Sequence, residues 1–166
     1  MRILRLVTVL ATCSFIIATA SATSALAQSV VERPDGPLQT GLSLGFTGNS
    51  LVSEARRYIG SNPTGRKSLW CGAFMDLVLK RTGHQGGGNL AANYARYGKR
   101  VPGPVVGAIA VMGRKGGGHV GVVSAIDANG NPVVISGNTW SRATGGKRAV
   151  SEHVYPRRRV YAYVMP

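Results

Sequence analysis

The sequence changes its character at Pro102 and Pro104, and this change limits the folds that it can adopt. Before these prolines, apolar residues recur at helical spacing. After them, short runs rich in Val, Ile and Tyr alternate with turn residues. Helices followed by strands are typical of an α+β domain. We therefore predict that helices pack on one face of a curved antiparallel sheet.

The helical half contains two well-marked helices. The first is expected to begin at Asn49 or Ser50, either of which can cap it, and to end at Gly60. The second begins at Cys71 and stops at Gly83, with basic residues near its C-terminal end, where cations oppose the helix dipole. The other predicted elements are a third short helix and five strands, at 89–97, 105–112, 119–127, 132–137, 150–155 and 160–165.

The first residues have the organisation of a secretory signal. A basic start with Arg2 and Arg5 precedes the mostly apolar run Leu6–Ala20, and Ala25-Leu26-Ala27 supplies a small-x-small cleavage pattern. We therefore expect a signal peptide at residues 1–27 and a mature protein that is periplasmic or secreted.

Cys13 lies inside the apolar run and would be removed with the signal. A lipoprotein anchor at Cys13 is the alternative, although Thr12 is a poor residue before a lipidated cysteine. Residues 28–49 contain prolines and glycines without a regular period, so we expect a flexible lead-in there and one domain at 50–166. No other stretch approaches the roughly 18 apolar residues of a membrane span, so we expect no transmembrane segment.

The chain is strongly basic, with 20 Lys and Arg against 6 Asp and Glu. Removal of the signal, which carries two arginines, leaves about 139 residues and a net charge of about +12. Such a surplus favours anionic surroundings, namely nucleic acid, lipid headgroups or envelope polymers. The basic residues come as scattered pairs without the aromatic series that stacks bases. We therefore expect anionic envelope polymers as partners, no specific nucleic acid, and a monomeric protein.

Cys71 is the one thiol left after the signal is removed, and it stands where a loop becomes a helix. Exported proteins normally pair their cysteines, so a single thiol is either an inert buried residue or a reactive one. At a helix start, unsatisfied backbone N–H groups and the positive end of the dipole would stabilise a thiolate, and they could also stabilise an oxyanion on a substrate carbonyl. Cys71 is therefore a candidate nucleophile.

His119 opens a predicted strand and has the chemistry to deprotonate Cys71 and to protonate a leaving amine. If Asn129-Gly130 forms a two-residue hairpin turn, counting outward places His119 opposite Trp140, with Asn138 two residues away on the same face. A carboxamide there can hold the imidazole toward the thiol, so Asn138 is the candidate third member. A single-residue bulge would break this relation.

Three short motifs stand together in this chain: Trp70-Cys71-Gly72-Ala73-Phe74 opening a helix, Gly118-His119-Val120-Gly121 opening a strand, and Ser136-Gly137-Asn138 ending the next. They resemble the papain-like cell-wall hydrolases of the NlpC and CHAP type, which are cysteine, histidine-dependent amidohydrolases or peptidases. The resemblance covers roughly Leu51 to Pro166. It implies a papain-like fold for the 50–166 domain and cleavage of peptide or amide bonds in bacterial peptidoglycan or its stem peptides, with Cys71, His119 and Asn138 as the catalytic set.

The chain departs mildly from the pattern of the most similar subgroup. That subgroup often has Pro-Trp-Cys and Gly-Gly-Asn, whereas Leu69 and Ser136 stand here at the first position of each motif. Trp70 and Trp140 are candidates for substrate binding, although aromatic packing in the core is the alternative. One Cys and three scattered His give no recognised zinc spacing, so we expect no metal and no cofactor.

Two other functions remain open at this point. A cationic module that binds the envelope or nucleic acid would use Cys71 only as a structural residue, and it would bind polymer without turnover. An acyl or peptidyl transferase would use the same thioester chemistry but deliver the acyl group to an amine rather than to water.

Overall fold

The computed structural model describes residues 44–166, with side chains from Ser50 onward. The predicted signal peptide, and the predicted lead-in up to residue 43, lie outside the described residues. The elements in chain order are α1 (Leu44–Arg56), α2 (Cys71–Arg81), η1 (Ala91–Arg96), β1 (Lys99–Val101), β2 (Ile109–Met112), β3 (His119–Ile126), β4 (Pro132–Trp140), η2 (Arg142–Thr144), β5 (Arg148–Val154), η3 (Arg157–Arg159) and β6 (Val160–Met165).

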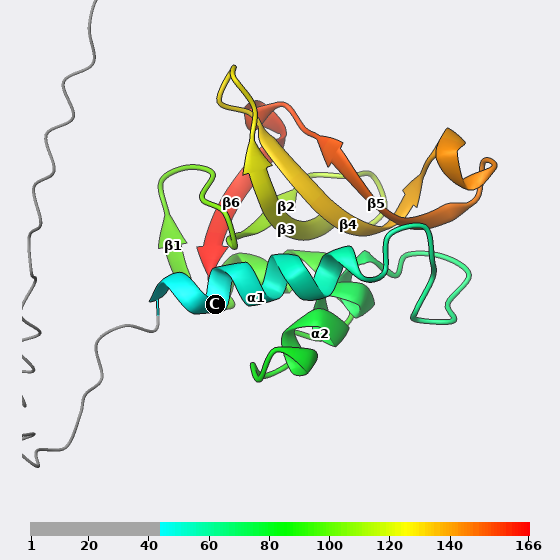
Figure 1. The fold of residues 1–166 in the computed structure, drawn as a ribbon, viewed down its shortest axis with the longest axis horizontal. Coiled ribbons are helices and arrows are strands. Elements are labelled where there is room, and N and C mark those ends of the chain that lie inside the picture. The colour runs from blue at the N-terminus through cyan, green and yellow to red at the C-terminus, as the bar shows by residue number, and fades with distance from the viewer. Residues whose placement is uncertain (1–43) are drawn as a thin grey trace, which may run out of the picture. The chain divides into compact units, whose positions relative to one another are not determined.

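The six strands form one antiparallel sheet in the order β1-β6-β2-β3-β4-β5. The helices α1 and α2 both pack against β3 and β4, and they lie on the same side of the sheet (Figure 1). The predicted α+β class is therefore confirmed. Among the described residues, no helix is long and apolar enough to cross a membrane.

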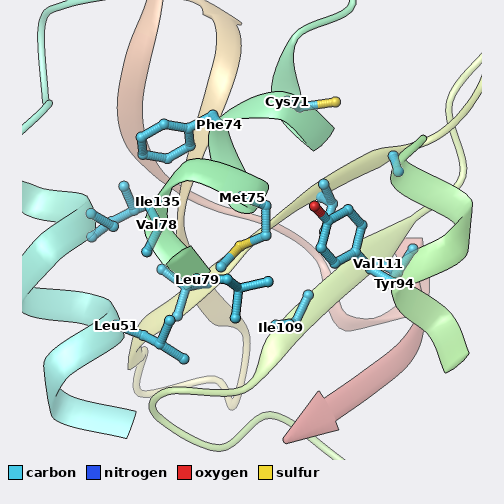
Figure 2. Close-up of a cluster of buried hydrophobic side chains, with 14 of the residues drawn as sticks. Leu51, Cys71, Phe74, Met75, Val78, Leu79, Tyr94, Ile109, Val111 and Ile135 are labelled. Carbon is cyan, nitrogen blue, oxygen red and sulfur yellow. The ribbon is translucent and has the colours of Figure 1, made fainter. Parts of the chain in front are cut away.

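The main apolar core lies between these helices and the sheet. Along α2, Phe74, Met75, Val78 and Leu79 are buried, because residues three or four apart share one face of a helix. Figure 2 shows these side chains together with Leu51 of α1, which closes the cluster from the other helix. Full burial of each contributes about 1.5–3 kcal/mol. Truncation of Leu79 to alanine would cost about 2–5 kcal/mol, because the site cannot collapse fully around the missing atoms.

The elements differ from the prediction mainly at their ends. The first helix begins at Leu44, inside the predicted lead-in, and ends at Arg56 rather than near Gly60. The strand predicted at 105–112 begins only at Ile109, because Gly107 has a φ of 89° that interrupts the extended chain. The short edge strand β1 was not predicted, and the third helix is a 3-10 helix.

The turn between β3 and β4 also differs from the prediction. The N–H of Asp127 donates to the carbonyl of Asn131 at 2.9 Å, so the loop has three residues. The Asp127 carboxylate accepts from the N–H groups of Asn129 and Asn131, at 2.9 and 2.7 Å, and thereby holds the loop. The predicted two-residue turn at Asn129-Gly130 is therefore wrong.

A bulge at Ser124 shifts the register of the same hairpin once more. Beyond the bulge, Gly121 pairs with Ser136, so the strands run on toward His119 and Asn138. A shift of the strand register by one residue turns every following side chain to the other face of the sheet, and a second shift turns it back. The longer loop and the bulge therefore compensate for each other. His119 does not face Trp140 as predicted, but it lies at the same end of the hairpin as Asn138.

Candidate active site

Cys71 is the first residue of α2 and is a free thiol with only 4% of its surface exposed. Figure 2 shows its side chain pointing away from the apolar cluster. It lines a hollow of about 80 Å³ whose other walls are Leu69, Asn89, Leu90, Ala91 and Gly116, Gly117 and Gly118. Gly118 directly precedes His119 in the chain, so the glycine wall of this hollow leads into the candidate base.

The start of α2 is held in place by one close backbone approach and by the side chain of Tyr94. A Cβ on Gly72 would lie 2.1 Å from the backbone oxygen of Asn89, so only glycine allows this contact. The phenol of Tyr94 bonds the carbonyl oxygens of Gly72 and Gly88, at 2.9 and 2.8 Å. Burial raises the pKa of Tyr94 far above its usual value, so the phenol stays protonated and remains a donor. Together these contacts fix the first turn that carries the thiol.

Trp70 is fully buried in the core, and this changes the role that the sequence suggested for it. A Cβ on Gly137 of β4 would lie 2.6 Å from the Trp70 ring, so the indole packs directly on the strand backbone. With no exposed surface, Trp70 positions the start of α2 rather than lining a cleft. The preceding residue, Leu69, has a φ of 53°, which proline could not adopt. Leu69 therefore has a backbone conformation that the proline of the Pro-Trp-Cys pattern could not have.

His119 is the first residue of β3 and is also buried, with 4% of its surface exposed. Its Nε2 lies 3.0 Å from the hydroxyl of Ser136 and 3.3 Å from the phenol oxygen of Tyr155. Ser136 in turn lies 3.1 Å from the hydroxyl of Thr139. The other ring nitrogen, Nδ1, has no hydrogen-bond partner among the residues that the structure describes. The imidazole is therefore anchored through one nitrogen and leaves the other free for chemistry.

The pKa of His119 is lowered to about 4, first by burial and then by the positive charges of Arg114 and Arg159. The partners of its Nε2 are neutral hydroxyls, which do not stabilise an imidazolium as a carboxylate would. The ring is therefore neutral at neutral pH, which is the state in which it can accept a proton.

Asn138 lies at the same end of the hairpin but makes no hydrogen bond to His119. It is 2% exposed, has a φ of 59°, and its Oδ1 has no hydrogen-bond partner in the described part of the chain. The partners observed on the imidazole are Ser136 and Tyr155, which the sequence analysis did not single out. Ser136 could have been found from its motif, since it precedes Asn138 by two residues. Tyr155 lies in the segment that connects β5 to η3, and no spacing rule relates it to His119.

A second, larger hollow of about 280 Å³ lies on the His119 side of the site. Trp140 lines this hollow and is half exposed. The remaining walls are Arg114, His119, Asn138, Thr139, Arg148, Tyr155 and Arg159. Among the residues that the structure describes, no three His, Cys, Asp or Glu side chains are grouped as metal ligands.

The family model of the CHAP domain matches residues 62–138. The chain contains a CHAP domain. This match includes Cys71, His119 and Asn138, and the six-stranded antiparallel sheet with Cys71 at a helix start agrees with the papain-like architecture of CHAP domains. Comparison with curated protein sequences gave no match. The CHAP domain points to a cysteine, histidine-dependent amidohydrolase or peptidase.

The CHAP match ends at Asn138, so part of the larger hollow lies beyond it. Trp140, Arg148, Tyr155 and Arg159 all follow this point in the chain. Within the match, the domain supplies a thiol at a helix start and a neutral imidazole with one unpaired nitrogen. Nucleophilic attack on an amide carbonyl requires groups of this kind.

Proposed function

We propose that the protein is an exported cysteine hydrolase that cleaves amide bonds in bacterial peptidoglycan. The observation that carries this proposal is the position of Cys71 at the start of α2, in a hollow whose glycine wall leads into His119. The CHAP family supports a cell-wall substrate. The basic charge of the chain supports a role near anionic polymers, and the signal-like N-terminus supports export.

In the proposed mechanism, the sulfur of Cys71 attacks the carbonyl carbon of the amide while Nδ1 of His119 takes the thiol proton. The first-turn N–H groups of α2 stabilise the negative charge that develops on the carbonyl oxygen. His119 then gives its proton to the nitrogen, the C–N bond breaks, and an amine leaves. Water, deprotonated by His119, hydrolyses the thioester to a carboxylic acid and restores the thiol.

Ser136 decides which nitrogen of His119 is free. If Nε2–H donates to the Ser136 hydroxyl, and that hydroxyl donates to Thr139, then Nδ1 keeps its lone pair and serves as the base. Asn138 and Trp140 line the hollow beside the imidazole, and in this proposal they contact the substrate.

The decisive experiment is mass analysis of muropeptides after incubation of sacculi with the purified protein and with its Cys71→Ala variant. We expect new free amine and carboxyl ends with the wild-type protein and none with the variant. The variant should keep the wild-type circular dichroism spectrum, because alanine fits the space of a cysteine. Equal cleavage by a folded Cys71→Ala variant would overturn the proposal.

The same assay separates the two alternatives. A binding module would retain sacculi without releasing new ends from either sacculi or a soluble muropeptide. A transferase would give amide adducts when glycine is added as an acceptor, in place of hydrolysed products.

Export has its own test. The N-terminal sequence of protein recovered from the periplasm or the medium should begin at Gln28 if the signal is cleaved after Ala27. Recovery of an uncleaved chain, or of a lipidated chain that begins at Cys13, would contradict this part of the proposal.

A further inference from the structure

Three arginines line the larger hollow, and none of them takes part in the proposed bond-breaking steps. Arg114 comes from the loop before β3, Arg148 opens β5, and Arg159 ends η3. Three separate segments of the chain therefore bring a guanidinium to one hollow beside His119. Convergence of this kind differs from the scattered basic pairs elsewhere on the surface.

No carboxylate of the described residues lines this hollow. The four that follow residue 49 are Glu54, Asp76, Asp127 and Glu152. Three of them pair with other cations, namely Arg57, Lys80 and Arg56, and the fourth holds the β3–β4 loop. The cations of the hollow therefore repel one another without a protein anion between them, and an anionic ligand would relieve that repulsion.

Two of the three guanidinium groups are held by neutral contacts that leave donors free. Arg148 donates from Nη1 to the backbone oxygen of Asn138 at 3.2 Å. Arg159 lies over the ring of Tyr155, 5.5 Å from its centre. A planar guanidinium held in this way is preorganised to bind a carboxylate through two parallel hydrogen bonds.

One residue that lines the hollow also has a buried polar atom without a partner. Asn138 is more than nine-tenths buried, and its Oδ1 has no hydrogen-bond partner among the described residues. Buried polar groups in proteins are nearly always satisfied, so a polar ligand is expected to enter beside it. This observation is independent of the charge count.

We propose that Arg114, Arg148 and Arg159 form a subsite that binds a carboxylate of the substrate, so that the protein selects acidic peptides. The proposal rests on the proposed function and adds the chemical class of its substrate. Stem peptides of the wall fit this class because they carry free carboxylates close to their amide bonds. Arg114 lies within the CHAP match, whereas Arg148 and Arg159 lie beyond it, so two of the three arginines of the subsite come from the part of this chain outside the family model.

The chain offers a matched control for every arginine. Lys115, Lys147 and Arg158 are exposed neighbours that do not line the hollow. A test variant with Arg114→Gln, Arg148→Gln and Arg159→Gln therefore loses the same charge as a control variant with Lys115→Gln, Lys147→Gln and Arg158→Gln. Both would be assayed on a soluble disaccharide peptide with free carboxylates, and on the same peptide after conversion of its carboxylates to primary amides.

We expect the test variant to lose about tenfold or more in kcat/KM on the acidic peptide, mostly through KM, because charge-assisted hydrogen bonds are lost. The control variant should stay within about twofold of the wild-type protein. Amidation should reduce cleavage by the wild-type protein to a similar extent and should have little further effect on the test variant. Equal losses in both variants, or equal cleavage of acid and amide by the wild-type protein, would overturn the subsite.

Binding by the catalytically silent Cys71→Ala protein keeps this inference separate from the proposed function. Titration with the acidic and the amidated peptide should show tighter binding of the acidic form, and addition of the three glutamine substitutions should abolish the difference. If the wild-type protein cuts neither peptide, the proposed function fails, and the titration alone decides the subsite. Competition by millimolar inorganic phosphate as strong as that by the acidic peptide would show a general anion site and overturn the selection of carboxylates.

Discussion

The hollow at Cys71 and the hollow at His119 share the loop at 113–118 but present opposite chemistry to a substrate. The first is small and lined by leucine, alanine, asparagine and glycine, with the thiol as its one ionisable group. The second is larger and is lined by three arginines, a histidine and a half-exposed tryptophan. The proposed nucleophile therefore lies among uncharged groups, whereas the proposed base lies among cations.

This difference shows how one cationic surface can serve two purposes. Burial, and after it the positive charge of Arg114 and Arg159, lowers the pKa of His119 and keeps the ring neutral, so it can accept a proton at neutral pH. The same charge can hold an anionic part of the substrate beside the reaction. The predictions below test whether the two hollows work as one site, and which residues connect them.

The largest effect is expected when either hollow loses its reactive group. Cys71→Ala and His119→Ala should each reduce turnover of a soluble muropeptide by about 10³-fold or more, because nucleophile and base act as a unit. The double variant should be no slower than either single one. Substantial turnover by folded His119→Ala, with Cys71→Ala inactive, would separate the hollows and remove the base from the mechanism.

Gly137 tests the contact that joins the two hollows. Gly137→Ala would bring a Cβ within 2.6 Å of Trp70 and 2.7 Å of Phe74, so α2 must shift away from β4. We expect a loss of about 1–3 kcal/mol in the free energy of unfolding, measured in urea. Gly113→Ala is the matched control, since its Cβ would meet nothing within 4 Å. Equal stability of the two variants would contradict the close packing of Trp70 and Phe74 on Gly137.

Ser136 and Asn138 compete for the role of positioning His119. Ser136→Ala should lower kcat/KM by about 10- to 100-fold and change its pH profile, because the tautomer of the ring is no longer held. Ser151→Ala is the control, since Ser151 pairs with Ser136 across β4 and β5 but its hydroxyl has no hydrogen-bond partner.

Asn138→Gly removes the amide without backbone strain, because glycine readily adopts the φ of 59° found there. We expect residual activity with the pH profile of the wild-type protein. A wild-type rate for this variant would remove Asn138 from the site, and a changed profile would return the positioning role to it.

The smallest expected effect concerns stability against pH. The pKa of His119 is about 4 in the folded protein and about 6.5 when unfolded. Its contribution to stability is therefore complete above pH 6.5 and is lost as the pH falls toward 4, since the unfolded chain binds the extra proton. Between pH 7 and pH 5 we expect the free energy of unfolding to fall by about 2 kcal/mol, and the His119→Gln variant should not show this loss. An equal loss in His119→Gln would assign the effect to other groups.

Long periodic segments made much of this fold predictable from sequence. The helix from Cys71 to Arg81 was found because its buried apolar residues recur at helical spacing, and the strand from His119 because it is rich in Val and is bounded by turn residues. The three-residue strand β1 offers too few residues for such a pattern. The turn at Asp127 and the bulge at Ser124 depend on side-chain hydrogen bonds and on strand pairing, which local spacing does not encode.

The candidate site shows the same limit. Cys71 and His119 could be proposed from sequence because their residue types carry rare chemistry, and the structure places both at element starts. The buried position of Trp70 depends on a glycine in a distant strand, and the contact of Tyr155 with His119 joins residues 36 apart. Such relations arise from tertiary packing, and a single sequence gives no spacing from which to count them.

The hairpin of β3 and β4 has a consequence for the order in which the site can assemble. His119, Ser136 and Asn138 belong to one hairpin closed by the three-residue loop at Asp127, and hairpins of this kind form in about 1–10 μs. Cys71 reaches them only through packing of α2 over a separation of about 50 residues, and contacts so distant in sequence form more slowly. The contact of His119 with Ser136 is thus a local product of the chain. The proposed nucleophile and base can come together only when the long-range fold is complete, so a partly folded chain would hold its thiol apart from the histidine.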